Sequence, residues 1–139
     1  MKKIYLAIPY TGIMDVSFNA ANEIAAKLIA DGLCVFSPIS HSHPIWEAGA
    51  GLVPNTHEVW MQQDKNFVQW CDEVWVVDLH NHNGLSLLFK SKGVQQEIEW
   101  AEEEARLNRE AAVKKIKYQQ QKYDVKDMTI RNTRATMKV

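Results

Sequence analysis

The sequence predicts an α/β fold, a small doubly wound parallel sheet of the Rossmann-like or flavodoxin-like kind with flanking helices. Short apolar runs rich in β-forming residues alternate with amphipathic segments of helical period, which is the order of a βαβ protein. The runs are apolar almost throughout, as expected of strands covered on both faces. A length of 139 residues with 46% hydrophobic and 24% charged residues is typical of one globular domain.

The first βαβ unit occupies residues 3–39. "KIYLAI" predicts a strand over 3–8 that ends at Pro9, and the loop that follows carries Gly12. Residues 17–32 place small and apolar side chains on one helical face and close with Gly32. "LCVFSPI" at 33–39 predicts the second strand, stopped by Pro38. Such a unit implies parallel strands with a right-handed crossover.

The second half predicts a long loop over 40–58, because three histidines and four glycine or proline breaks leave no sustained period there. A helix over 59–72 and a buried strand over 73–79 follow, then another loop over 80–90. The last helix is expected over 91–118, with its acidic half first and its basic half last, the order that the helix dipole favours.

The domain is therefore expected to span 1–118, followed by a polar, basic extension over 119–139 that is flexible or ordered by a partner. Arg131, Arg134 and Lys138 make this tail locally positive. The chain as a whole has a net charge of −1, which makes nucleic-acid binding unlikely except through the tail. Nucleic-acid association through this tail therefore stays open as one possible function.

The cellular setting is expected to be cytoplasmic. Cys34 and Cys71 lack metal-ligand spacing and are interpreted as reduced, buried thiols rather than a disulfide framework. The apolar run after the basic start is too short for a signal-peptide core, and no stretch approaches the length of a membrane span. No membrane partner is expected.

Four segments rich in polar and glycine residues lie where the predicted strands end or the last helix begins: "PYTG", "SPISHSHP", "DLHNHNG" and "SKGVQQE". In doubly wound sheets the ligand binds in the crevice beyond the carboxyl ends of the strands. We therefore expect a small-molecule site at this edge. The candidate binding residues are Pro9, Tyr10, Gly12, Ser40, His41, His43, Asp78, Ser91 and Gly93.

The start of the last helix is a candidate anion-binding position, because its N–H groups and dipole suit a phosphate or carboxylate. Ser91 and Gly93 stand at that start, although Ser91 could equally be only an N-cap. Glu97 and Glu99 follow, and residues two apart on a helix do not share a face. One glutamate can face the crevice while the other is solvated.

The pieces "YLAIPYTG", "FSPISHSHPI", "CDEVWVVDL" and "SKGVQQEIEWAEE" resemble the nucleoside 2-deoxyribosyltransferase-like superfamily, and within it the DUF1937 type of phage and bacterial domains. The resemblance runs from about Lys3 to about Glu103. It implies that Glu97 is the nucleophile that attacks the anomeric carbon of a ribosyl group. It also implies that Tyr5 hydrogen-bonds Glu97 and that Asp64 positions the sugar and the nucleophile. The alternatives are a solvated Glu97, a core-filling Tyr5 and a surface Asp64.

One departure from the resemblance bears on the substrate. The transferases proper have an aspartate six residues before the nucleophile, and this chain has Ser91 there, as does the branch that hydrolyses nucleoside 5′-monophosphates. The resemblance thus implies an N-glycosidase acting on a (deoxy)nucleoside 5′-monophosphate. With Ser91 unable to act as the acid, the leaving base needs another proton donor. The candidates are His41, His43, His80, His82 and Asp78.

Two other functions remain open, namely base exchange between nucleosides and a non-catalytic module that binds or sequesters a nucleotide-derived ligand. No cofactor and no metal are expected, since relatives need no metal. The pair His41 and His43, with His57 and Glu58 later in the chain, lacks the usual spacing of zinc ligands. Trp46 and Trp60 could stack a base, fill the core or bury an oligomer contact. Relatives form dimers or larger assemblies, which implies a homo-oligomer here.

Overall fold

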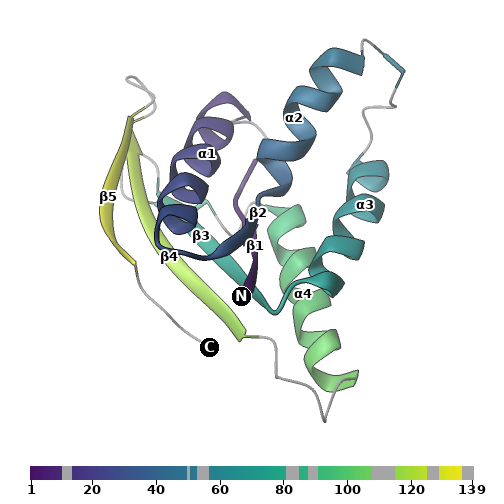
Figure 1. Cartoon of the computed structure of the whole chain (residues 1–139). Helices are drawn as coiled ribbons and strands as arrows, with labels where there is room; N and C mark the ends of the chain where they lie inside the picture. Colours follow the sequence, from purple (N-terminus) through teal and green to yellow (C-terminus); the bar gives the residue numbers. More distant parts are fainter. Residues whose placement is uncertain are drawn as a thin grey trace.

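The computed structural model describes residues 1–10, 14–49, 51–52, 57–80, 85–87, 91–107, 115–124 and 129–135. Strands and helices alternate through the first part of the chain, which confirms the α/β prediction (Figure 1). In chain order the elements are β1 (Lys3–Ala7), α1 (Met14–Ala30), β2 (Cys34–Phe36), α2 (Pro38–Gly49), α3 (His57–Trp70), β3 (Glu73–His80), α4 (Lys92–Leu107), β4 (Lys115–Asp124) and β5 (Thr129–Ala135).

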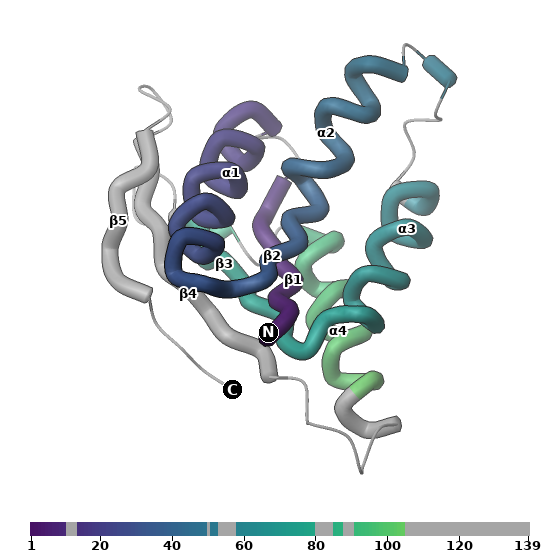
Figure 2. The backbone as a smooth tube through the Cα atoms, in the orientation of Figure 1, coloured from purple at the N-terminus to yellow at the C-terminus, as the bar shows by residue number. Residues whose placement is uncertain are grey.

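The sheet has the order β2-β1-β3-β4-β5. β1 pairs in parallel with both β2 and β3, β3 pairs in parallel with β4, and β5 runs antiparallel to β4. Helix α1 covers one face of the sheet and α3 and α4 cover the other, as the smooth backbone trace also shows (Figure 2). The sheet is therefore doubly wound, with its carboxyl edge open to receive a ligand.

The alternation of side chains along β1 divides the core into two layers. Ile4, Leu6 and Ile8 belong to the cluster that includes α1, whereas Tyr5 and Ala7 belong to the cluster that includes α3 and α4. All five side chains are nearly or fully buried. Because successive residues of a strand point to opposite faces, Tyr5 is directed toward α3 and α4 by its position in the strand alone.

Helix α1 ends as the sequence predicts. Gly32 has a φ of +90°. The N–H of Gly32 donates to the carbonyl of Ile29 at 2.9 Å, and the N–H of Leu33 donates to the carbonyl of Leu28 at 3.1 Å. This pair of bonds is a Schellman motif, in which glycine accepts the left-handed conformation at low cost. The motif turns the chain from α1 into β2.

The loop predicted over 40–58 is wrong in its first half, because Pro38–Gly49 forms helix α2. Pro38 is the first residue of that helix, where a missing N–H costs nothing. Ser37 caps it, since the N–H of Ser40 donates to Ser37 Oγ at 3.4 Å. Pro44 lies inside the helix and was misinterpreted as a loop signal. Residues 50 and 53–56 lie outside the described part of the chain.

The helix predicted over 91–118 is also too long, because α4 ends at Leu107 and β4 begins at Lys115. Strand β3 is apolar and would otherwise present an unpaired edge, and β4 pairs with that edge. The start of the tail, residues 119–124, and then residues 129–135 thus lie in β4 and β5. The boundary between a domain over 1–118 and an extension stays a prediction.

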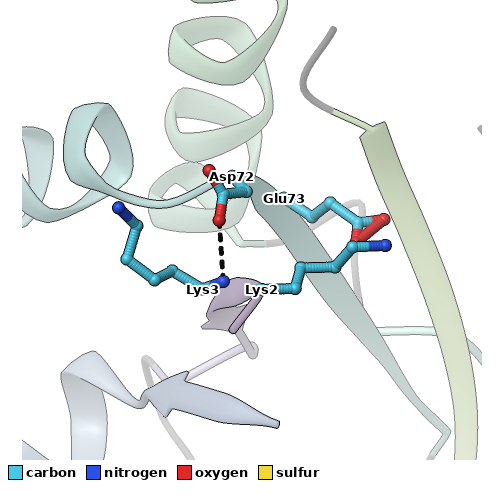
Figure 3. A network of polar contacts seen from close by, with 4 residues as sticks. All are labelled: Lys2, Lys3, Asp72 and Glu73. Carbon is cyan, nitrogen blue, oxygen red and sulfur yellow. Dashed lines mark hydrogen bonds and ion pairs between the residues drawn. The ribbon is translucent and has the colours of Figure 1, made fainter. Parts of the chain in front are cut away.

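Polar contacts at the amino edge of the sheet fix the pairing of β1 with β3 (Figure 3). The backbone N–H of Lys3 donates to Asp72 Oδ2 at 2.8 Å, and the N–H of Asp72 donates back to the Lys3 carbonyl at 2.8 Å. Lys2 Nζ lies 2.9 Å from Glu73 Oε2, whose side chain is 4% exposed. Lys3 Nζ lies 4.9 Å from the centre of the Trp70 ring. These contacts set the register at the edge opposite the ligand crevice.

None of the helices in the described ranges is both long enough and apolar enough to cross a membrane.

Candidate active site

A cavity of about 290 Å³ opens at the carboxyl edge of the sheet, where a ligand is expected in this fold. Its walls come from the end of β1, the start of α1, and from α2, α3 and α4. The cavity is close to the lower end of the range for small-molecule sites, about 300 Å³. The lining residues are Ile8, Tyr10, Met14, Pro38, Ile39, Ser42, His43, Trp46, Trp60, Met61, Asp64, Ser91, Gly93, Val94 and Glu97.

Two carboxyl groups from different helices line the same cavity. Glu97 of α4 is 4% exposed and Asp64 of α3 is 7% exposed. Burial raises the pKa of Glu97 to about 8, an increase that the nearby phenol of Tyr5 reduces and the charge of Asp64 enlarges. Burial likewise raises the pKa of Asp64 to about 7. Each carboxyl group therefore changes protonation state near neutral pH, which is a property of acid–base and nucleophilic sites.

Tyr5 is fully buried and lies close enough to both carboxyl groups for their charges to act on it. Burial raises its pKa well above the ordinary value, and the charges of Glu97 and Asp64 raise it further. The contact between Tyr5 and Glu97 lies outside ordinary hydrogen-bond geometry, since neither Tyr5 Oη nor Glu97 Oε2 has such a partner among the described residues. The phenol is nonetheless close enough to act on the pKa of Glu97. Tyr5 thus stays protonated and faces the carboxyl group.

Ser91 stands at the start of α4, and its role in anion binding stays a prediction. It caps α4, because the N–H of Val94 donates to Ser91 Oγ at 3.3 Å and the N–H of Gln95 donates to the Ser91 carbonyl at 3.1 Å. Ser91 and Gly93 also line the cavity. The start of α4, with the N–H groups that a first turn leaves unpaired, therefore borders the space above Glu97.

Tyr10 and His43 form another wall of the cavity. Tyr10 Oη lies 2.5 Å from His43 Nδ1, and His43 Nε2 lies 2.8 Å from Glu47 Oε1. The His43 ring stacks on Phe18 with 4.5 Å between ring centres. Both ring nitrogens of His43 are thus engaged, and the imidazole is held in one orientation.

The structure keeps Pro9 and Ser40 out of the cavity lining. The Pro9 carbonyl accepts a hydrogen bond from Ser17 Oγ in the buried start of α1. Ser40 Oγ donates to Asn22 Oδ1 at 2.5 Å and lies 2.8 Å from Ser37 Oγ. Ser40 therefore joins α2 to α1 rather than facing the ligand space.

His41, Asp78 and Gly12 were also candidates. His41 packs against the rings of Phe36 and Phe67, with 5.5 and 5.9 Å between ring centres, and does not line the cavity. Asp78 accepts a hydrogen bond from Ser86 Oγ and does not line it either. Gly12 lies outside the described residues, as do His82 and the side chain of His80.

Sequence reasoning missed most of the apolar lining. Ile39, His43 and Trp46 have the i, i+4, i+7 spacing of one helical face, which would have indicated the cavity side of α2. Trp60 and Asp64 are likewise four residues apart on α3. This spacing is visible in the sequence, but a segment that is predicted to be a loop offers no helical face on which to place it.

Among the residues with described side chains, no group of three histidine, cysteine, aspartate or glutamate side chains is arranged to hold a metal ion.

Comparison with known proteins gives the family to which the chain belongs. The family model described as "Domain of unknown function (DUF1937)" matches residues 2–110, and the chain belongs to that family. A solved structure of a 2-deoxyribosyltransferase from the psychrotolerant bacterium Bacillus psychrosaccharolyticus is similar, at 17% identity and a TM-score of 0.49. That similarity covers 85% of this chain and 72% of the transferase. No curated protein matches the chain.

Proposed function

We propose that the protein is an N-glycosidase that cleaves the base–sugar bond of a (deoxy)nucleoside 5′-monophosphate, with Glu97 as the nucleophile. The observation that carries the proposal is the buried pair of Glu97 and Asp64 in one cavity, with the phenol of Tyr5 close by. An oxocarbenium-like transition state needs a carboxylate at the anomeric carbon, either as a charge partner or as a covalent trap. Glu97 is the most deeply buried carboxyl group of the lining.

The start of α4 supports a substrate that carries a 5′-phosphate. Ser91 Oγ accepts a hydrogen bond from Val94, which leaves its own proton available for an anion. The N–H groups of Lys92 and Gly93 lie in the first turn, where the helix dipole favours negative charge. With the phosphate bound there, the sugar would lie toward Glu97, one turn further along the helix.

The apolar part of the cavity supports an aromatic leaving group. Trp46 of α2 and Trp60 of α3 both line the space, together with Met61 and Ile39. Indole rings stack on nucleobases with little preference among them. The base would therefore lie on the side of α2 and α3, away from the start of α4.

The reaction has two steps. The Glu97 carboxylate attacks C1′, the C1′–N bond breaks, and the base leaves with a proton, which gives a glycosyl ester on Glu97. Water then attacks C1′, and Glu97 leaves as carboxylate while the sugar phosphate is released. Tyr5 would hold the Glu97 rotamer, and Asp64 would hold the sugar and accept the proton of the attacking water.

The test is a chromatographic assay for free base released from a panel of ribo- and deoxyribonucleoside 5′-monophosphates and their unphosphorylated forms. Release that requires both the 5′-phosphate and Glu97, and is lost in Glu97→Gln, would support the proposal. Base exchange would instead appear as a new nucleoside when a second base is added. If no substrate releases base while calorimetry still detects a bound nucleotide, the protein is a binding module and the glycosidase proposal is wrong.

A further inference from the structure

The hydroxyl of Ser42 lines the cavity and has no partner among the residues that the structure describes. Ser42 lies inside α2, where a serine either points to solvent or donates to the carbonyl one turn before it. Its neighbour Ser40 is engaged within the protein, since Ser40 Oγ donates to Asn22 Oδ1 at 2.5 Å and lies 2.8 Å from Ser37 Oγ. Ser42 Oγ therefore borders the ligand space with its proton and its lone pairs uncommitted.

The other polar groups on this wall are engaged with one another. Tyr10 Oη lies 2.5 Å from His43 Nδ1, and His43 Nε2 lies 2.8 Å from Glu47 Oε1. The α2 residues that line the cavity are Pro38, Ile39, Ser42, His43 and Trp46. Of these, Ser42 alone keeps a group that can both donate a hydrogen bond to a ligand and accept one from it.

Ser42 also lies beside the aromatic part of the cavity. Ser42 and Trp46 are four residues apart on α2, so they share a face of the helix, and both line the cavity. Trp60 and Met61 of α3 complete the apolar lining on which the base is proposed to lie. Stacking on aromatic rings accepts any base, because every base has an aromatic face. Discrimination among bases therefore needs a polar group at the edge of the base, and Ser42 is placed to supply one.

We infer that Ser42 is a specificity-determining residue, which hydrogen-bonds the edge of the base and so sets which leaving groups the site accepts. The inference rests on the proposed function, because it takes the ligand to be a nucleotide with its base on the side of α2. The edge opposite the glycosidic bond carries a carbonyl or amino group at C6 of a purine or C4 of a pyrimidine. A serine hydroxyl donates to the carbonyl or accepts from the amino group. Ser42 should thus accept both groups and disfavour a base with only hydrogen there.

A double-mutant cycle on binding tests the inference. One ligand is the nucleoside 5′-monophosphate of the panel that binds most tightly, and the other is its analogue with hydrogen in place of the exocyclic group. Calorimetry measures both affinities in the Glu97→Gln background, in which no ligand is consumed. With Ser42 present, loss of the exocyclic group should weaken binding about 5- to 100-fold, the range for one neutral hydrogen bond whose partner is left unsatisfied. With Ser42→Ala added, the two ligands should bind within about threefold of each other, because the alanine has no group to leave unsatisfied.

Two further variants make the cycle specific to Ser42. Ser40→Ala is the matched control, because Ser40 lies on the same helix, bonds within the protein and does not line the cavity. It should leave the ratio of the two affinities unchanged, even where it destabilises α2. Tyr10→Phe removes the other hydroxyl of this wall, which His43 already engages, and should also leave the ratio unchanged.

The outcomes separate the inference from the proposed function. If Ser42→Ala weakens binding of both ligands equally, or of neither, Ser42 does not contact the exocyclic group and the inference is overturned. A ratio that collapses in Tyr10→Phe and persists in Ser42→Ala would assign recognition of the base to Tyr10 instead. If the ratio depends on Ser42 while wild type releases no base, the inference stands and the glycosidase proposal is wrong. If no nucleotide binds, both are wrong.

Discussion

The phenol of Tyr5 and the carboxyl group of Glu97 lie close to one another beside the cavity that Glu97 lines, and both side chains are buried. They come from β1 and α4, which lie far apart in the sequence. Strand alternation directs Tyr5 to this layer, and the helical position of Glu97 brings its carboxyl group to the same place. The pKa of Glu97 therefore depends on Tyr5, which lowers it, and on the charge of Asp64, which raises it.

The first prediction concerns how Tyr5 and Asp64 change the pH dependence of activity. In the proposed mechanism Glu97 must be ionised, so kcat/KM should fall as pH drops below about 8, the raised pKa of Glu97. Tyr5→Phe removes the hydroxyl that lowers this pKa and should move the acid limb to higher pH. Asp64→Asn removes a negative charge that raises it and should move the limb to lower pH.

A pH series of kcat/KM for wild type and both variants checks this. The apparent pKa values belong to the coupled pair rather than to either carboxyl group alone, so the sign of each movement is the readout. Movement of the acid limb in the same direction in both variants would contradict the opposite effects of Tyr5 and Asp64 on the pKa of Glu97.

The second prediction is a dependence of stability on pH. The pKa of Glu97 rises from 4.5 to about 8 on folding, so the native state binds more protons than the unfolded chain between these values. The free energy of unfolding should therefore be highest below pH 4.5 as far as Glu97 is concerned, and should fall as pH rises to about 8. Glu97→Gln should remove the Glu97 share of this slope and leave the share of Asp64, whose pKa is raised to about 7. The variant should be more stable than wild type at pH 8–9, by on the order of a few kcal/mol.

Denaturant melts of wild type and Glu97→Gln at pH 5 and pH 8.5 measure the effect. Glu99→Gln is the matched control, because Glu99 is exposed on the same helix and should leave the slope unchanged. If the free energy of unfolding of wild type does not fall between pH 5 and pH 8.5, or falls as steeply in Glu97→Gln, then Glu97 is not held in a desolvated position.

The third prediction concerns stability alone and the amino edge of the sheet. Lys2→Ala removes a partner that lies 2.9 Å from a buried oxygen of Glu73. The loss should lower the free energy of unfolding by about 1 kcal/mol or more, because a buried polar group gives up one of its contacts. The cavity lies at the other edge, so the affinity for a nucleotide, measured by calorimetry, should remain within about twofold of wild type. A large loss of affinity would mean that the two edges are coupled.

The sequence predicted the layers of the fold better than the walls of the site. Strands over 3–8, 33–39 and 73–79 were recognisable because each is an apolar run with clear stops, and each corresponds to a strand of the structure. Helix α2 was not recognisable, because Pro44 and the glycines that follow it are normally breaks. Its stability comes from packing of Ile39 against the α1 layer, a tertiary effect.

The candidate site shows the same division. Tyr5, Asp64 and Glu97 could be proposed from the resemblance to a known family, and the structure brings the three together. The choice between His41 and His43 could not be made, because it depends on the phase of a helix that was interpreted as a loop. Once α2 is known, one of them faces Phe67 and the other faces the cavity.

The fourth prediction assigns the aromatic side of the cavity. Trp46→Ala should weaken binding of the nucleotide by about 1–3 kcal/mol, the usual contribution of one stacked base, and should raise KM accordingly. Trp70→Ala is the matched control, because Trp70 is 51% exposed and lies at the other edge beside Lys3. Calorimetric titration with the nucleotide and with ribose 5-phosphate, which lacks a base, separates stacking from other effects. A loss of the same size for both ligands would mean that Trp46 does not contact the base.

The fifth prediction tests the start of α4 as a phosphate site. Aspartate and asparagine cap helices about as well as serine, so Ser91→Asp and Ser91→Asn both keep the cap that Val94 requires. The aspartate adds a negative charge where the 5′-phosphate is proposed to bind, whereas the asparagine adds only volume. The ratio of kcat/KM for the nucleoside 5′-monophosphate to that for the unphosphorylated nucleoside should therefore be at least about 10-fold lower in Ser91→Asp than in Ser91→Asn, since close charges of like sign cost about 1 kcal/mol or more. Equal ratios in the two variants would move the phosphate away from Ser91 and would favour a nucleoside without phosphate as the substrate.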